Sequence, residues 1–316
     1  MGRHKKVHDF RFVEALLEVF EVQEIYTQEL ESKSLRVDMF LNIDLIIAGP
    51  LTDVISVIPP EINLPILGIS HAFDLNIEYE DYPVLGNIER CEAILSDCKH
   101  ITKKLRNTYQ YTKSIFEIPW GCDREYFSMT QIEFERKPKI LVTRNWFPIY
   151  RNDLVLSALK MLDLKAIDFS CTFVGTGPLL EYHSRDFATI SKTSSIRFLG
   201  YQDQKRIRDE MSDNWIYISA ASSDGTSVSL LEAMAAGMIC IVTDFPSNQE
   251  WIENSINGFT FPNGDHKALS LLIEKVSSLT LDEKIKISGA AKEVIARRGD
   301  WKENRKIFTS VVQTML

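Results

Sequence analysis

A polar loop that runs directly into a helix is the stretch of this sequence best suited to bind a ligand. Residues 222–226 are turn and cap residues, and the helix-forming run 229–236 follows them. The free amides and the dipole of a helix N-terminus attract an anion, above all a phosphate. Asp224 and Glu232 lie near that N-terminus, where a carboxylate is suited to the hydroxyl groups of a ribose or another sugar. The pattern therefore predicts a nucleotide-sugar pocket.

Apolar segments on either side predict the elements that hold this loop. Residues 215–219 are expected to form the strand that leads into the loop, Gly237 to end the helix, and residues 239–243 to form a buried strand. A strand, loop, helix and strand in this order are typical of an α/β sheet.

The loop and its helix resemble the signature of retaining glycosyltransferases of the family 4 type, the group 1 glycosyltransferases. The family's usual first residue is Glu, so Asp224 is one methylene shorter, and Ser227 stands where the family usually has a second glycine. The resemblance implies that Glu232 binds the ribose diol, that Asp224 holds a sugar hydroxyl, and that the amides of Gly225, Thr226 and Ser227 meet phosphate or sugar oxygens. The positions that match the family motif are Asp224, Glu232, Ala233, Met234, Ala235 and Gly237.

Two arginines follow the strand expected over residues 139–143. The family places an Arg directly after this strand and a Lys a few residues on, both against the donor diphosphate; Arg144 matches the first, and Arg151 is the best candidate for the second. A departing diphosphate needs positive charge. The chain contains no Asp-x-Asp sequence. We therefore expect arginines and helix amides in place of a metal ion, and no cofactor.

A glycine turn and a histidine complete the predicted site. Gly175 and Gly177 resemble the family's Val-Gly-x-Gly-Pro segment, which with its adjacent backbone would line the nucleoside base. His71 follows the strand expected over residues 64–70, at the strand end where α/β sheets bind ligands. By residue type alone a structural histidine is equally expected. Family members carry a His in the corresponding motif, facing the transferred sugar, which favours a functional role.

The resemblance also implies the architecture. It predicts an α/β fold of the GT-B type, in which two doubly wound Rossmann-like domains face each other across a cleft. We place the acceptor-side domain at residues 1–132 and the nucleotide-sugar-binding domain at 133–316, with a terminal helix over 301–316 crossing back to the first domain. The chain opens with a helix over residues 8–20 and a strand at 21–26, so the first domain is expected to lack its usual first strand.

Composition limits the class of protein. The 316 residues are enough for two domains, and 45% hydrophobic with 25% charged residues is typical of a globular protein. The net charge of −8 argues against binding to nucleic acid. The five scattered cysteines fit a cytoplasmic protein, and no apolar run reaches the ~20 residues that span a bilayer. The basic N-terminal residues leave open a peripheral contact with the membrane or a solvated terminus: Arg3, Lys5, Lys6 and Arg11.

The function implied by the resemblance is glycosyl transfer with retention, from a nucleotide-diphosphate sugar to a glycan, lipid-linked or small-molecule acceptor. Three alternatives stay open. The first is a GT-B nucleotide-sugar epimerase, and the second is a non-catalytic nucleotide-sugar-binding or scaffold protein. In the third, Asp224 merely caps a helix and Glu232 faces solvent. Turnover of a nucleotide sugar would distinguish the transferase and the epimerase from the scaffold protein and from the third alternative. Dependence of that turnover on an acceptor would distinguish the transferase from the epimerase.

Overall fold

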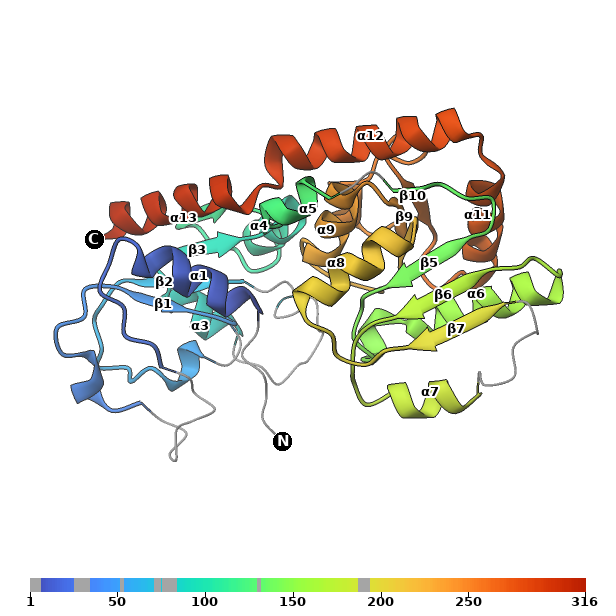
Figure 1. Ribbon diagram of the computed structural model, residues 1–316. Helices are drawn as coiled ribbons and strands as arrows, with labels where there is room; N and C mark the ends of the chain where they lie inside the picture. The colour runs from blue at the N-terminus through green and yellow to red at the C-terminus, as the bar shows by residue number, and fades with distance from the viewer. Residues whose placement is uncertain are drawn as a thin grey trace. The chain divides into compact units, whose positions relative to one another are not determined.

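The chain folds into two compact units, each built on a parallel β-sheet (Figure 1). The computed structural model describes residues 7–25, 35–51, 54–70, 75, 84–129, 132–186 and 194–316. Unit 1 comprises Met1–Pro119 with Trp301–Leu316, and unit 2 comprises Trp120–Asp300. His71 lies outside the described residues, so its predicted role stays a prediction.

The sheet of unit 1 has the strand order β1-β2-β3-β4, with every neighbouring pair parallel. Its two central strands are buried throughout, as expected for parallel strands covered on both faces. The strands follow one another across the sheet in sequence order. Connections between parallel strands are right-handed, so connections that all advance in the same direction lie on the same face of the sheet. Within the described residues, unit 1 therefore resembles one half of a doubly wound sheet. The strands are Ile46–Ala48, Ile66–Ile69, Ala93–Ser96 and Ser114–Glu117, and the connections include η3 (Ile55–Val57), α3 (Val84–Arg90) and α4 (Lys99–Asn107).

The terminal helix α13 (Trp301–Met315) belongs to unit 1, where it packs against α1 (Val7–Leu17). The ring of Phe12 meets Trp301 edge-on at 5.7 Å and Phe308 at 4.6 Å between centroids. The strand predicted at residues 21–26 is wrong for 21–25, which have no regular structure, and residue 26 is not described. The short helix η2 (Val37–Phe40) precedes β1 instead.

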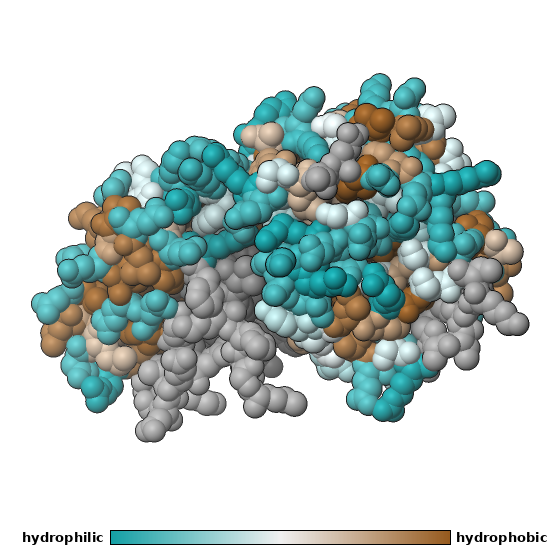
Figure 2. All heavy atoms as spheres, viewed as in Figure 1, coloured by the Kyte–Doolittle hydropathy of each residue, from teal (hydrophilic) through white to brown (hydrophobic). Residues whose placement is uncertain are grey.

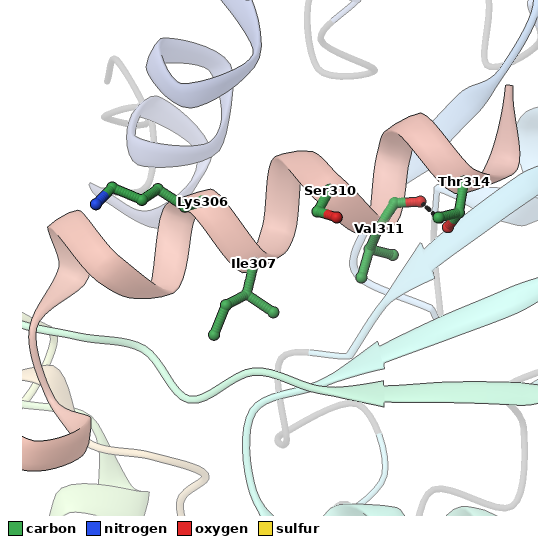
Figure 3. A pocket seen from close by; sticks show the side chains of 5 residues that line it. All are labelled: Lys306, Ile307, Ser310, Val311 and Thr314. Atoms are coloured by element: carbon green, nitrogen blue, oxygen red, sulfur yellow. Dashed lines mark hydrogen bonds between the residues drawn. The ribbon is translucent and has the colours of Figure 1, made fainter.

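The exposed surface of unit 1 carries several hydrophobic side chains (Figure 2). A shallow hollow of about 330 Å³ runs along one side of α13 (Figure 3). None of the predicted site residues lines it; the lining residues are Lys306, Ile307, Ser310, Val311 and Thr314.

Unit 2 contains a six-stranded sheet in the order β10-β9-β8-β5-β6-β7, again with parallel neighbours. The chain starts in the middle at β5, moves to the β7 edge, and returns to build the other half from β8. This is the doubly wound arrangement that the sequence predicted. The strands are Lys139–Val142, Ser170–Phe173, Ser195–Phe198, Ile216–Ser219, Ile239–Thr243 and Phe259–Phe261.

Helices cover both faces of this sheet. Helices α6 and α11 pack together, while α8, α9 and α12 form a second group (Figure 1). Helix α9 is apolar almost all round and is buried along most of its length, which fits a helix enclosed by the sheet and by α12. The helices are η4 (Pro148–Tyr150), α6 (Asn152–Leu164), α7 (Leu180–Asp186), α8 (Gln204–Asp213), α9 (Val228–Ala236), α10 (Pro246–Gln249), α11 (His266–Ser278) and α12 (Leu281–Arg298).

Unit 2 begins at Trp120, whereas the sequence analysis ended the first domain at residue 132. The short helix α5 (Arg124–Phe127) lies in the intervening segment, and its Tyr126 side chain is fully buried in the core of unit 2. The Cys122 amide also donates to the Gly299 carbonyl at 2.8 Å. The segment therefore packs with the second sheet and belongs to unit 2.

Candidate functional site

The candidate site lies where the strand order of unit 2 reverses. Strands β5 and β8 are neighbours, but the chain leaves them toward opposite halves of the sheet, so the loops beyond their carboxyl ends diverge. Open α/β sheets bind ligands in the crevice that such a divergence leaves. Here the loop after β5 carries Arg144, and the loop after β8 carries Asp224. The two loops are joined by the Ser222 amide, which donates to the Ile149 carbonyl at 2.8 Å.

Arg144 and Asp224 form a largely buried ion pair. Arg144 Nη2 donates to Asp224 Oδ2 at 2.5 Å, and the two side chains are 9% and 23% exposed. Burial is the largest single effect and lowers the pKa of Arg144. The charge of Asp224, the hydrogen bond to it and the neighbouring phenols of Tyr150 and Tyr217 together outweigh burial, so the pKa rises. The guanidinium is therefore a permanent cation although it is largely buried.

Two further contacts hold this cation in place. The guanidinium carbon lies 4.1 Å from the centre of the Tyr150 ring, a favourable cation–π geometry. The Asn152 side-chain amide donates to the Arg144 carbonyl at 3.0 Å. Within the part of the chain that the structure describes, Arg144 Nε is buried and donates to no acceptor. Buried polar groups are normally satisfied, so this donor is suited to an anionic ligand.

A cluster of hydroxyl groups surrounds the guanidinium at the start of α9. Arg144 Nη1 donates to Ser227 Oγ at 2.7 Å and to Ser229 Oγ at 3.2 Å, and the Tyr217 hydroxyl lies 2.9 Å from Ser229 Oγ. Ser227 is the N-cap residue of α9, but its side chain makes no cap hydrogen bond because it faces Arg144. Hydroxyl groups and a buried cation thus meet at the N-terminus of α9, an arrangement that is suited to an anion.

Asp224 does not cap α9, contrary to the third alternative of the sequence analysis. Its Oδ2 faces Arg144, and its Oδ1 accepts from the Gly225 amide at 3.0 Å. Its carbonyl accepts from Ser247 Oγ at 3.0 Å. Asp224 is therefore fixed as the counter-ion of Arg144, beside the Gly225, Thr226 and Ser227 backbone.

Glu232 is 4% exposed, so the same alternative is also wrong in placing it in solvent. It lies in the second turn of α9, next to Tyr126 from α5. Burial raises the pKa of Tyr126, and the charge of Glu232 and a hydrogen bond to it raise that pKa further. Glu232 is thus a buried carboxylate about one turn along α9 from Ser227 and Ser229.

The backbone at Gly175 and Gly177 packs against the loop that carries Arg144. Both have positive φ angles, +129° and +152°. A Cβ at Gly177 would lie 2.6 Å from the Trp146 carbonyl oxygen, and one at Gly175 would lie 2.9 Å from Asn145 Oδ1. The Trp146 amide also donates to the Thr176 carbonyl at 2.9 Å. Only glycine permits this close approach, which fixes the backbone that carries Arg144.

Arg151 lies at the far end of the same loop in a left-handed conformation, with φ of 47°. Its Nε lies 3.4 Å from Asp153 Oδ1, and its side chain is 36% exposed. No described contact joins it to the Arg144 cluster. Its predicted role at the diphosphate stays a prediction.

The sequence analysis did not identify Tyr150, Asn152, Tyr217, Ser229 or Tyr126. Ser229 carried a usable signal, since it stands two residues after Ser227 at the start of the helix. Tyr217 lies in the strand that leads into the loop, whereas Tyr126, Tyr150 and Asn152 are more than 70 positions before Asp224, and only the fold brings them near. Among the described residues, no group of three or more His, Cys, Asp and Glu side chains could hold a metal ion.

Two parallel-sheet Rossmann-like units, the second with a cluster of charged and hydroxyl side chains at its switch point, form the architecture of the GT-B class. The chain belongs to the family Glycosyl transferases group 1, which matches residues 125–294. This match covers the whole candidate site of unit 2.

Two curated proteins are similar to this chain at low identity. One is the amylovoran biosynthesis glycosyltransferase AmsK of Erwinia amylovora, 23% identical over 51% of this chain and 44% of its own. The other is the GtfA subunit of the UDP-N-acetylglucosamine–peptide N-acetylglucosaminyltransferase of Streptococcus agalactiae, 24% identical over 80% of this chain and 51% of its own. The chain thus spans about half the length of the curated relatives it matches.

Solved structures share the fold. The pneumococcal O-GlcNAc transferase GtfA, crystallised with UDP and GlcNAc, superposes with a TM-score of 0.64 at 15% identity, over 80% of this chain and 53% of its own. HepE of Anabaena, crystallised with UDP, gives a TM-score of 0.69 at 14% identity, over 88% of this chain and 80% of its own. No helix in the described part of the chain has the length and apolar character needed to cross a membrane.

Proposed function

We propose that this chain transfers a sugar, with retention of configuration, from a nucleotide-diphosphate sugar to a hydroxyl acceptor. The observation that carries the proposal is the Arg144–Asp224 pair at the start of α9, with Glu232 buried further along the same helix. A cation and helix amides are suited to a diphosphate, and a carboxylate is suited to a diol. The family provides the reaction class.

We assign each predicted site residue a role in this reaction. Arg144 stabilises the negative charge that grows on the diphosphate as the bond to the sugar breaks, with the helix amides of α9 behind it. Arg151 is the proposed second cation. Glu232 accepts hydrogen bonds from the ribose, and Asp224 orients a sugar hydroxyl while it holds Arg144 in place. His71 is proposed to face the sugar.

Retention is proposed without a covalent intermediate on the protein. The two-carboxylate scheme of hydrolases needs a carboxylate placed against the anomeric carbon. Here Asp224 pairs with Arg144 and Glu232 lies beside Tyr126. We propose instead that the acceptor oxygen bonds to the anomeric carbon on the face that the diphosphate leaves. The acceptor proton passes to the departing phosphate oxygen, so that charge and atoms balance.

The donor, acceptor and location are proposals of the same kind. UDP is the nucleotide in the crystals of both structural neighbours above, so UDP-sugars are the first donors to test. The acceptor is a glycan, a lipid-linked glycan or a small molecule. The reaction needs no metal ion, because Arg144 and the α9 amides supply the positive charge.

All five cysteines are free and buried, which supports a reducing, cytoplasmic location with or without peripheral membrane contact.

Turnover tests this function. Purified protein is incubated with UDP-, GDP- or ADP-sugars and a panel of glycan, lipid-linked and small-molecule acceptors, and nucleotide release is measured. Proton NMR of the product then gives the anomeric configuration. We expect acceptor-dependent release from one donor class and a product with the donor's configuration. Release without an acceptor, with isomerised sugar, would favour the epimerase; no release with any donor, despite nucleotide binding, would favour the scaffold.

A further inference from the structure

Ser227 occupies the N-cap position of α9 without capping the helix. A serine at this position normally accepts a hydrogen bond from one of the first helix amides, which have no partner within the helix. The Ser227 side chain makes no such bond, and its Oγ accepts from Arg144 Nη1 at 2.7 Å instead. This hydroxyl group therefore belongs to the charged cluster at the switch point and not to the helix cap.

A chain of three hydroxyl groups leads inward from Ser227. Ser227 Oγ lies 3.2 Å from Ser229 Oγ, which lies 2.9 Å from the hydroxyl oxygen of Tyr217. Arg144 Nη1 donates to both serines. Tyr217 is fully buried in β8, and Ser227 is 5% exposed. The chain thus runs from the core of unit 2 to the start of α9.

The count of protons in this chain decides what Ser227 can offer to a ligand. A hydroxyl group donates one hydrogen bond and accepts two, whereas a guanidinium only donates. When Tyr217 donates to Ser229, the other lone pair of Ser229 accepts from Arg144. The proton of Ser229 then goes to Ser227. Because Ser227 accepts from Ser229 and Arg144, its own proton is left without an acceptor among the described residues.

The opposite direction leaves Ser227 with a free lone pair and no donor, because its proton goes to Ser229 and that of Ser229 goes to Tyr217. An anion accepts hydrogen bonds, so it selects the first direction, in which Ser227 presents its proton. Arg144 Nε is also buried and donates to no acceptor in the described part of the chain. The first amides of α9 receive no acceptor from the N-cap side chain. This end of the helix therefore carries several donors that suit one anion.

We propose that the Ser227 hydroxyl group binds the diphosphate of the donor directly, with Ser229 and Tyr217 behind it to set the direction of its proton. The inference rests on the proposed function, in which this end of α9 holds the diphosphate. It adds a side-chain donor to the backbone amide of the same residue. The family usually has glycine here, so the extra donor belongs to this chain and not to the family motif. A hydrogen bond to the departing phosphate also stabilises the charge that grows on it.

Ser227→Ala is the test, because it removes the hydroxyl group and keeps the backbone amide and the Arg144 cation. The probes are UDP, GDP and ADP; the one that binds the wild type most tightly is titrated by calorimetry, and its nucleoside is measured by competition. Because hydrogen bonds to charged groups are the stronger kind, Ser227→Ala should weaken the nucleoside diphosphate by about tenfold or more and the nucleoside by less than about twofold. Ser227→Gly introduces the family's usual residue and should behave in the same way. It replaces Ser227→Ala if that variant does not fold by circular dichroism.

Ser229→Ala separates a direct contact from an effect through Arg144. Both serines accept from Arg144 Nη1, so a residue that only held the guanidinium would lose similar affinity at either position. We expect Ser229→Ala to weaken the nucleoside diphosphate by less than about threefold. Phosphorus NMR of the saturated complexes is the second readout: Ser227→Ala should move the signal of one phosphate group further from its wild-type position than Ser229→Ala does.

Ser270→Ala is the matched control. Ser270 is a buried serine of α11 whose hydroxyl group has no partner within the described chain. Its replacement should leave both the affinities and the phosphorus signals unchanged.

The outcomes separate this inference from the function on which it rests. If the wild type prefers the nucleoside diphosphate to the nucleoside and both Ser227→Ala and Ser227→Gly keep that preference, the role of the hydroxyl group is wrong while the proposed function stands. Equal losses in Ser227→Ala and Ser229→Ala, with equal phosphorus signals, would show that Ser227 only holds Arg144. If the wild type binds no nucleotide, or if Arg144→Ala keeps the preference for the diphosphate, the diphosphate site is wrong and the role of Ser227 falls with it.

Discussion

The two sheets of this protein are both built from short parallel strands but differ in how the chain winds through them. In unit 2 the strand order reverses between β5 and β8, whereas the described strands of unit 1 follow one another in a single direction. The loops after β5 and β8 therefore diverge, and Arg144 and Asp224 meet between them. The described strand ends of unit 1 show no reversal of this kind.

Two described serines at strand ends of unit 1 bind backbone carbonyls. The Ser70 amide donates to the Leu95 carbonyl at 3.0 Å, and Ser96 Oγ donates to the Cys98 carbonyl at 2.9 Å. Among the described strand ends, the buried ion pair occurs where the strand order reverses. A reversal of strand order leaves room for a buried charged pair, and the first test is whether function depends on that pair.

Arg144→Ala should have the largest effect on turnover. Removal of a group that stabilises charge in the transition state typically costs about 10²–10³-fold in kcat. The measurement is nucleotide release from the donor at saturation. Arg106→Ala is the control in unit 1, where Arg106 donates to the Tyr111 and Lys113 carbonyls near the sheet. Turnover of Arg144→Ala within tenfold of the wild type would contradict the comparison.

Asp224→Ala should reduce kcat by about tenfold or more, while the donor Kd changes by less than about threefold. The variant lacks the carboxylate that is proposed to bind a sugar hydroxyl, but it keeps the buried guanidinium of Arg144 that is proposed to bind the diphosphate. Steady-state kinetics with calorimetry separates the two quantities. Asp153→Ala, which removes the exposed partner of Arg151, is the matched control. A loss confined to donor binding would mean that Asp224 serves only to hold Arg144.

Gly177→Ala should lower the melting temperature more than Gly264→Ala does. Both glycines have positive φ angles, but a Cβ at Gly177 would lie 2.6 Å from the Trp146 carbonyl oxygen, whereas nothing lies within 4 Å of one at Gly264. Backbone strain costs on the order of 1 kcal/mol at either position, and the clash adds to it at Gly177 alone. Calorimetric unfolding compares the two. Equal losses would show that the Arg144 loop can move aside freely.

A chelator should have the smallest effect of all. Because Arg144 and the α9 amides are proposed to supply the positive charge, EDTA should leave the rate of nucleotide release unchanged. The same assay with added Mg²⁺ or Mn²⁺ is the control. Activity that disappears with EDTA and returns with a divalent ion would contradict the metal-free proposal.

Local patterns in the sequence were sufficient to predict the organisation of unit 2. The predicted strands at 215–219 and 239–243 match β8 and β9, and the doubly wound order is confirmed. In these segments hydrophobic periodicity and glycine positions agree with the fold. At residues 21–25 they did not, because a short apolar pattern without a defined partner strand does not fix its own structure.

The candidate site was predictable as a set of residues but not as a set of contacts. Asp224 was expected to face a sugar, and the structure adds its ion pair with Arg144, 80 positions earlier in the chain. Tyr126 and Glu232 are likewise far apart in sequence and meet only through the packing of α5 on α9. No local pattern encodes such pairs, since they depend on how distant elements pack.

The central claim is that α9 binds a nucleotide diphosphate at its N-terminus and the ribose through Glu232. Calorimetric titration of the wild type and Glu232→Ala with UDP, GDP and ADP tests it most directly, with thermal unfolding of both proteins in parallel. We predict that one nucleotide binds the wild type and stabilises it by about 2.7 kcal/mol at 100 times its Kd, and that Glu232→Ala loses this binding while it stays folded. Equal binding by both proteins, or none by either, would contradict the account.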